Sequence, residues 1–248
     1  MNTTASGALL SGLRTRQATS PALIWYGGSG ERIELSGKVL DNWVAKTSNF
    51  LVDELDAEPG LRLRLDLPVH WKTLVWVLAA WQTGCTVVLG SPAESGPADV
   101  TVSAAMDGAA TAGGAGTVVA VALGALELSF PADLPAGVVD YAAEVRSYAD
   151  TYLEEDRPDA GQTALETAGA TRARTLRGTV SYATLGELLG TGGNTGEVLL
   201  ATGTDLPHVL EGAVAAWAAG GAVVLAGAGV EPDEKVLASE RVTKRLEA

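Results

Sequence analysis

Three arginines that lie close together in the second half of the sequence are the clearest candidate for a site. Arg172, Arg174 and Arg177 share a segment that is otherwise rich in alanine, threonine and glycine. Guanidinium groups bind carboxylates and phosphates through charge-assisted hydrogen bonds. The chain carries 17 basic against 30 acidic residues, so this cluster is a local positive region in an otherwise acidic molecule. An anion is attracted to such a region. The segment therefore predicts an anion site, with an ordinary solvated loop as the alternative.

Other residue types that commonly carry catalysis are scarce in this sequence. Cys85 is the only cysteine, and it stands in a continuous apolar run, so we interpret it as a packing residue and not as a nucleophile. His70 and His208 are the only histidines, and neither lies in an H-E-x-x-H zinc pattern. The sequence also contains no G-x-x-x-x-G-K-[ST] phosphate loop. These observations predict no catalytic residue and no metal site.

The net charge of −13 disfavours two classes of partner. Nucleic acids and anionic membrane surfaces are both repelled by such a field. Near the start of the chain, Leu9, Leu10 and Leu13 precede Arg14 and Arg16, which is the reverse of the order in a secretory signal. No apolar run approaches the ~18 residues that a membrane helix requires. We therefore expect a cytoplasmic protein that binds neither nucleic acid nor membrane.

Hydrophobic patterning indicates strands and helices that alternate along the chain, which is typical of a layered α/β fold. The best-defined unit is an alternating strand over 61–67, an apolar helix over 68–83 and a buried strand over 85–89. This order implies a right-handed crossover between parallel strands. The same patterning predicts strands over 22–26, 32–35, 99–102 (at a sheet edge), 117–123, 198–200 and 222–225, and helices over 9–13, 36–51, 138–152, 183–189, 209–218 and from 233 onward.

We expect a single domain over residues 1–248, with subregions 1–95, 96–150 and 175–248. Residues 154–174 are predicted to form a mobile loop between the last two subregions, and residues 160–178 to be poorly ordered in the free protein. Their small and polar side chains offer little apolar surface, whereas ordering the backbone costs about 1–2 kcal/mol per residue.

Several segments together carry a family resemblance. In the front part they are Pro21 to Tyr26, Ile33 to Leu55, Pro59 to Leu67, Pro68-Val69-His70-Trp71 and Gly84-Cys85-Thr86-Val87-Val88-Leu89, and near the end Thr204 to Gly212, Gly220 to Leu225 and Glu240-Arg241-Val242-Thr243. Their order resembles the adenylate-forming superfamily of acyl-CoA synthetases, luciferases and peptide-synthetase adenylation domains, and in particular a set of shortened actinobacterial homologues of unknown function. The resemblance implies a layered sheet–helix domain like the N-terminal part of acyl-CoA synthetases, lacking their barrel and C-terminal lid.

The resemblance places the arginine segment at the phosphate loop of that superfamily, where backbone N–H groups and hydroxyls surround the phosphates of ATP. Thr167, Gly169, Thr171 and Gly178 stand in matching places, and Arg177 stands where the family has a lysine. The family's second glycine and its proline are missing, and the loop is longer. The segment is therefore a candidate phosphate or anion site on two grounds, with a decayed loop as the alternative.

The resemblance also implies a ligand pocket and a catalytic defect. His208 looks like a family residue that lies along the acyl pocket, with a satisfied core histidine as the alternative. The chain ends at Ala248, before the family's ribose-binding aspartate, its Mg²⁺-coordinating glutamate and the lysine of its C-terminal domain. Since adenylation depends on these groups to orient ATP, we expect no acyl-adenylate formation by this chain alone. No cofactor is expected, with binding of ATP and Mg²⁺ at the loop as the alternative.

Three functions remain open from the sequence, and the missing catalytic groups favour a protein that is not an enzyme. The first is a catalytically defective homologue that binds a small acyl or nucleotide ligand or a protein partner. The second is an acid–thiol or acyl-adenylate ligase that is active only with a separate chain supplying the missing half. The third is a homo-oligomeric structural protein without a ligand. The native mass discriminates among them, because the second requires a hetero-complex and the third a homo-oligomer.

Overall fold

The computed structural model describes residues 4–28, 30–106, 116–154, 157–190 and 196–246. In these residues the strands form two sheets in which parallel pairing dominates. The five-stranded sheet has the order β12 (Lys244–Arg245), β10 (Val198–Ala201), β11 (Ala222–Ala226), β1 (Pro21–Tyr26) and β2 (Arg32–Ser36). The seven-stranded sheet has the order β7 (Val138–Asp140), β6 (Thr117–Ala120), β5 (Val100–Ser103), β3 (Arg62–Asp66), β4 (Thr86–Leu89), β8 (Thr163–Thr167) and β9 (Thr179–Ser181). Antiparallel pairing joins β1 to β2 and β8 to β9.

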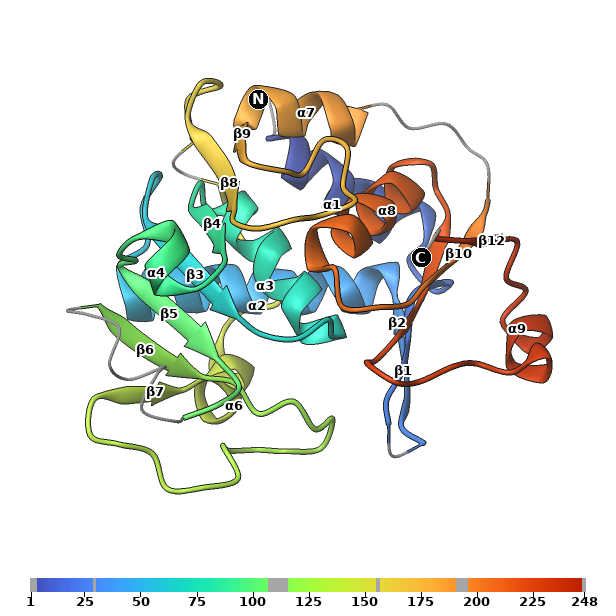
Figure 1. The fold of residues 1–248 in the computed structure, drawn as a ribbon, viewed down its shortest axis with the longest axis horizontal. Helices are drawn as coiled ribbons and strands as arrows, with labels where there is room; N and C mark the ends of the chain where they lie inside the picture. Colours follow the sequence, from blue (N-terminus) through green and yellow to red (C-terminus); the bar gives the residue numbers. More distant parts are fainter. Residues whose placement is uncertain (1–3, 29, 107–115, 155–156, 191–195, 247–248) are drawn as a thin grey trace.

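The helices lie partly between the two sheets and partly around them (Figure 1). They are α1 (Ala5–Arg16), α2 (Gly37–Leu55), α3 (Trp71–Gln82), α4 (Pro92–Ser95), α6 (Tyr141–Glu144), α7 (Tyr182–Gly190), α8 (Leu206–Ala218) and α9 (Glu234–Ser239), with a 3₁₀ turn over Val145–Ser147. In the part of the chain that is described, no helix is long and apolar enough to cross a membrane.

The core is centred on α2 and α3, which lie side by side in the middle of the molecule (Figure 1). Every residue of α3 is buried, as a helix that is apolar all round requires. The indole Nε1 of Trp81 donates a hydrogen bond to the carbonyl oxygen of Ala164 in β8, over 3.0 Å. Phe50 of α2 meets the ring of Trp76 edge to face, with centroids 5.9 Å apart. One apolar cluster thus ties the helices to the seven-stranded sheet.

The strand–helix–strand unit predicted over 61–89 is confirmed. It consists of β3, α3 and β4, and β3 pairs with β4 in parallel. His70 begins α3, because its Nδ1 accepts the backbone N–H of Lys72 at 3.2 Å. Gly84 lies in the turn between α3 and β4 with φ at +81°, a conformation that favours glycine.

Two predictions about the middle of the chain are wrong. The strand predicted at a sheet edge near 99–102 is β5, which lies between β3 and β6, because β6 and β7 extend the sheet beyond it. The helix predicted over 138–152 is shortened to α6, because Val138 and Val139 join the sheet in β7. Asp140 then starts the helix by accepting the N–H groups of Ala142 and Ala143. The β-branched pair before an aspartate is a pattern typical of a strand followed by a helix cap.

The loop predicted over 154–174 also requires a correction. Its middle part, Thr163–Thr167, forms β8, which pairs in parallel with β4. Ala164 and Leu165 are fully buried there. This stretch therefore buries apolar surface, contrary to the prediction that residues 160–178 offer little of it. The short alternating run T-A-L-E-T is the signal for this strand. The mobility of the remaining parts of the loop stays a prediction.

Candidate ligand site

The candidate site lies where β10 leads into α8, at the carboxyl end of a parallel strand. Ligands of open α/β sheets commonly bind at such ends. Between the strand and the helix, Gly203 has φ at +102°, a conformation that favours glycine. Asp205 then caps α8, and its Oδ1 accepts the backbone N–H of His208 at 3.2 Å. This turn places polar groups at the carboxyl end of β10.

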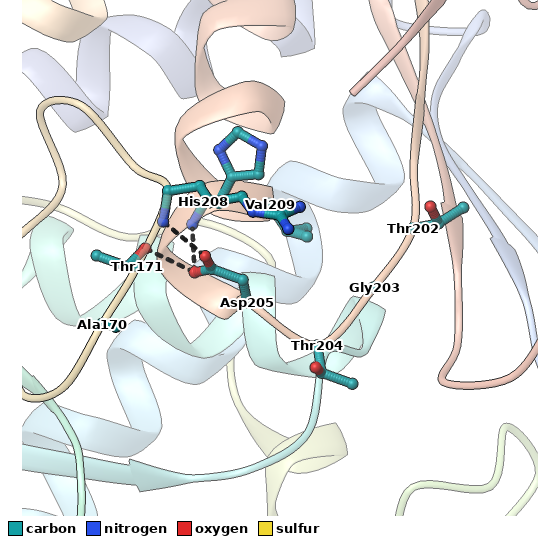
Figure 2. Close-up of a pocket in the computed structure, with 9 residues that line it drawn as sticks. Ala170, Thr171, Thr202, Gly203, Thr204, Asp205, His208 and Val209 are labelled. Atoms are coloured by element: carbon teal, nitrogen blue, oxygen red, sulfur yellow. Dashed lines mark hydrogen bonds between the residues drawn. The ribbon is translucent and has the colours of Figure 1, made fainter. Parts of the chain in front are cut away.

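A cavity of about 480 Å³ opens at this turn, and the loop between β8 and β9 forms its other wall. Figure 2 shows the residues that line it. They are Ala170, Thr171 and Arg172 from the loop, Thr202, Gly203, Thr204 and Asp205 from the turn, and His208 and Val209 from α8. A second cavity of about 620 Å³ shares Thr202 and Gly203 and continues toward the end of β11. Two segments that are distant in sequence thus form one site.

Asp205 joins the loop to α8. Besides capping the helix, its Oδ1 accepts the hydroxyl of Thr171 at 2.6 Å and its Oδ2 accepts the backbone N–H of Arg172 at 2.8 Å (Figure 2). Burial alone would raise the pKa of Asp205, but the hydrogen bonds from Thr171, Arg172 and His208 outweigh it and hold that pKa below its usual value. Asp205 is therefore an ionised carboxylate with both oxygens already bonded.

Glu211 holds the next part of the loop in the same way. Its Oε1 accepts the backbone N–H of Arg174 at 3.1 Å, and its Oε2 accepts those of Thr175 and Leu176 at 2.7 and 2.9 Å. Ala173 and Leu176 of the same segment are buried. The loop is therefore anchored both by apolar contacts and by carboxylates of α8.

The base of the loop is closed by two of the predicted site residues. The Oγ1 of Thr167 accepts the backbone N–H of Gly178 at 2.6 Å, and the N–H of Thr167 donates to the carbonyl oxygen of Gly178 at 2.9 Å. Gly169 and Gly178 adopt φ of +83° and +64°, which favours glycine at both turns. These residues shape the loop and do not line the cavity.

The structure brings together some of the predicted site residues and separates others. Thr171, Arg172 and His208 line the same cavity. Arg174 and Arg177 are exposed and lie outside its lining. The three arginines therefore do not surround one point, and Arg172 is the member of the cluster that a ligand in the cavity could reach.

Sequence reasoning missed Asp205 and Glu211. An aspartate directly before Leu-Pro is an N-cap signal that could have identified Asp205 as the start of α8. No sequence pattern connects Glu211 with the loop, which lies 35 to 37 residues earlier in the chain. Such a contact is set by the packing of α8 against the sheet and is not encoded locally.

Other titratable groups lie away from this site. His70 is buried, and burial together with the nearby charge of Lys72 lowers its pKa to about 3. Burial raises the pKa of the Cys85 thiol to about 11, as expected for a packing cysteine that is not a nucleophile. Within the described residues, no group of three or more histidine, cysteine, aspartate or glutamate side chains could hold a metal ion.

Solved structures share this fold. The acyl-CoA synthetase of Brucella canis matches with a TM-score of 0.73 and 17% identity, over 98% of this chain and 46% of that one. The N-terminal subdomain of NpsA from Klebsiella oxytoca matches with a TM-score of 0.62 and 13% identity, over 96% of this chain and 59% of that one. Another NpsA structure, with a TM-score of 0.61 and 14% identity over 96% and 58% of the two chains, is a complex with 3-hydroxybenzoyl-AMSN. The chain thus has the layered fold of the N-terminal part of acyl-CoA synthetases, and its described strands form no barrel.

A protein of Mycobacterium tuberculosis (strain H37Rv) is similar in sequence as well. It is a TIGR03089 family protein, 39% identical over 163 residues, which are 63% of this chain and 65% of that protein. The chain thus spans less than two thirds of this relative and about half of the synthetase. No protein-family model matches the chain.

Proposed function

We propose that this chain is a binding module for a small acyl ligand and does not itself form acyl-adenylates. The observation that carries the proposal is the cavity shared by Arg172 of the loop and His208 of α8. A guanidinium at the mouth of a cavity suits a ligand carboxylate. The negative charge of Asp205 does not oppose such a ligand strongly, because three donors already bond that carboxylate. The NpsA complex with an acyl-adenylate analogue supports an acyl ligand for this fold.

The absence of catalysis is supported by the loop itself. Adenylation requires N–H groups and cations that are free to meet the phosphates of ATP. In this chain the N–H groups of Arg172, Arg174, Thr175 and Leu176 are engaged by α8. Arg177, which the resemblance aligns with the family's lysine, is exposed and away from the cavity.

The proposal is tested by titrating the protein with carboxylic acids, including octanoate, benzoate and 3-hydroxybenzoate, in a calorimeter. We expect at least one acid to bind, and Arg172→Ala to weaken that binding about tenfold, since a charge-assisted hydrogen bond is lost. Arg174→Ala is the matched control, because it removes an exposed arginine of the same loop that does not line the cavity. Equal loss in both variants, or no binding of any acid, would count against the proposal.

A further inference from the structure

The loop between β8 and β9 presents its backbone in a way that usually serves an external anion. A hydroxyl and several backbone N–H groups of one short loop converge on negatively charged oxygens, and such concave sets of N–H groups bind phosphates and carboxylates. Here the oxygens belong to the protein itself. Asp205 accepts hydrogen bonds from the hydroxyl of Thr171 and the N–H of Arg172, and Glu211 accepts hydrogen bonds from three further N–H groups.

We propose that Asp205 and Glu211 determine which ligand the site accepts, because they occupy the loop as built-in anions and exclude polyphosphates. An acyl carboxylate then enters the cavity without a nucleotide. This inference rests on the proposed function for the acyl ligand, and it adds a reason why the loop would not take a phosphate ligand.

The geometry leaves a polyphosphate without a place on this loop. To reach the N–H groups, it would have to displace two ionised carboxylates that are held within 2.6 to 3.1 Å of their loop donors. If it bound beside them, its charges would face like charges, which disfavours binding. The loop cannot turn its N–H groups elsewhere at low cost, because Ala173 and Leu176 of the same segment are buried. A carboxylate ligand can leave these hydrogen bonds in place, since it requires only the side chain of Arg172 in the cavity lining. Its single charge also meets less repulsion from Asp205 than the several charges of a polyphosphate would.

The experiment compares pyrophosphate binding by the full chain and by Glu211→Gln, with calorimetry at neutral pH. Glutamine has one side-chain oxygen and no charge, so at least one of the three loop N–H groups loses its acceptor. We expect pyrophosphate to bind Glu211→Gln about tenfold or more tighter than the wild type. Glu187→Gln is the matched control, because Glu187 is an exposed glutamate of α7 with the same charge. It should bind like the wild type.

A second variant keeps the test decisive if Glu211→Gln does not fold. Asp205→Asn removes the charge at the other end of the loop and should also gain pyrophosphate binding. Wild-type protein that binds pyrophosphate as tightly as both variants would overturn the inference, as would an equal gain in Glu187→Gln. The carboxylic acid titration is a separate arm: if the variants gain pyrophosphate binding while the wild type binds no acid, the proposed function fails and the exclusion of polyphosphate stands.

Discussion

A single carboxylate can connect two elements that are far apart in sequence, and Asp205 does so here. It caps α8 through the N–H of His208 and holds the loop through Thr171 and Arg172. Capping side chains contribute about 0.5–2 kcal/mol to stability, and the contacts to the loop add to this role. The ligand site and the start of the helix therefore depend on the same charge.

Another residue, His70, makes stability sensitive to mild acid. Its folded-state pKa is lowered to about 3 by burial and by Lys72, whereas an unfolded histidine has a pKa of about 6.5. Below about pH 6.5 the unfolded chain binds a proton that the folded chain does not, so stability falls as the pH falls from 6.5 toward 3. We expect His70→Asn, which keeps a side-chain acceptor for the helix cap, to flatten this part of the profile. Urea unfolding at pH 7, 6, 5 and 4 measures it, and parallel profiles for the two proteins would contradict the expectation.

At the scale of elements, the loop between β8 and β9 is an anchored segment of the described chain. Leu176 is fully buried, and its own N–H bonds to Glu211. We expect Leu176→Ala to destabilise the protein by about 2–4 kcal/mol, because it leaves a cavity in the core. It should also speed trypsin cleavage after Arg174 and Arg177, because the loop loses its apolar anchor.

Leu128→Ala provides the control for this change, since Leu128 is 70% exposed and the same atoms are removed without a cavity. Tryptic digestion followed by mass spectrometry identifies the cleaved bonds. Wild-type protein that is cleaved after these arginines as fast as Leu176→Ala would show that the loop is mobile in the free protein, as the composition of residues 160–178 predicts.

The sequence could predict elements whose patterns are local. The apolar helix before Gly84 appears in the structure where the residue pattern puts it. The helices predicted to start near residues 36 and 233 also begin there, with Ser36 and Asp233 as their N-caps. The strand β8 was missed because its five residues lie inside a polar segment, and burial against β4 decides its state. The candidate site could be located in part, since Thr171, Arg172 and His208 do meet. Its carboxylates could not be assigned a role, because that role depends on a contact between distant segments.

At the scale of the whole molecule, the five-stranded sheet joins the two ends of the described chain. β1 from the front part pairs in parallel with β11 from the end, in a register that aligns Leu23 with Val223. Trp217 of α8 also donates its indole N–H to the carbonyl oxygen of Ala22 at 2.8 Å. The helix that carries His208 and Glu211 is thus positioned by the first strand. Distant parts of the chain must therefore assemble before the ligand site exists.

The final prediction concerns the activity of the assembled molecule. We expect the purified chain to show no exchange of pyrophosphate into ATP that depends on a carboxylic acid. The loop N–H groups are engaged by Asp205 and Glu211, and Arg177, which the sequence resemblance aligns with a lysine of the synthetases, is exposed. The measurement should include Arg177→Ala, which would abolish any exchange that used this residue as the family uses its lysine. It should be repeated on protein purified from its native host, with the native mass determined beside it. Exchange that appears only in a complex larger than this chain would support a ligase assembled from two chains. Acid-dependent exchange by the chain alone that is lost in Arg177→Ala would instead contradict the expectation, because it would show that the loop binds phosphates.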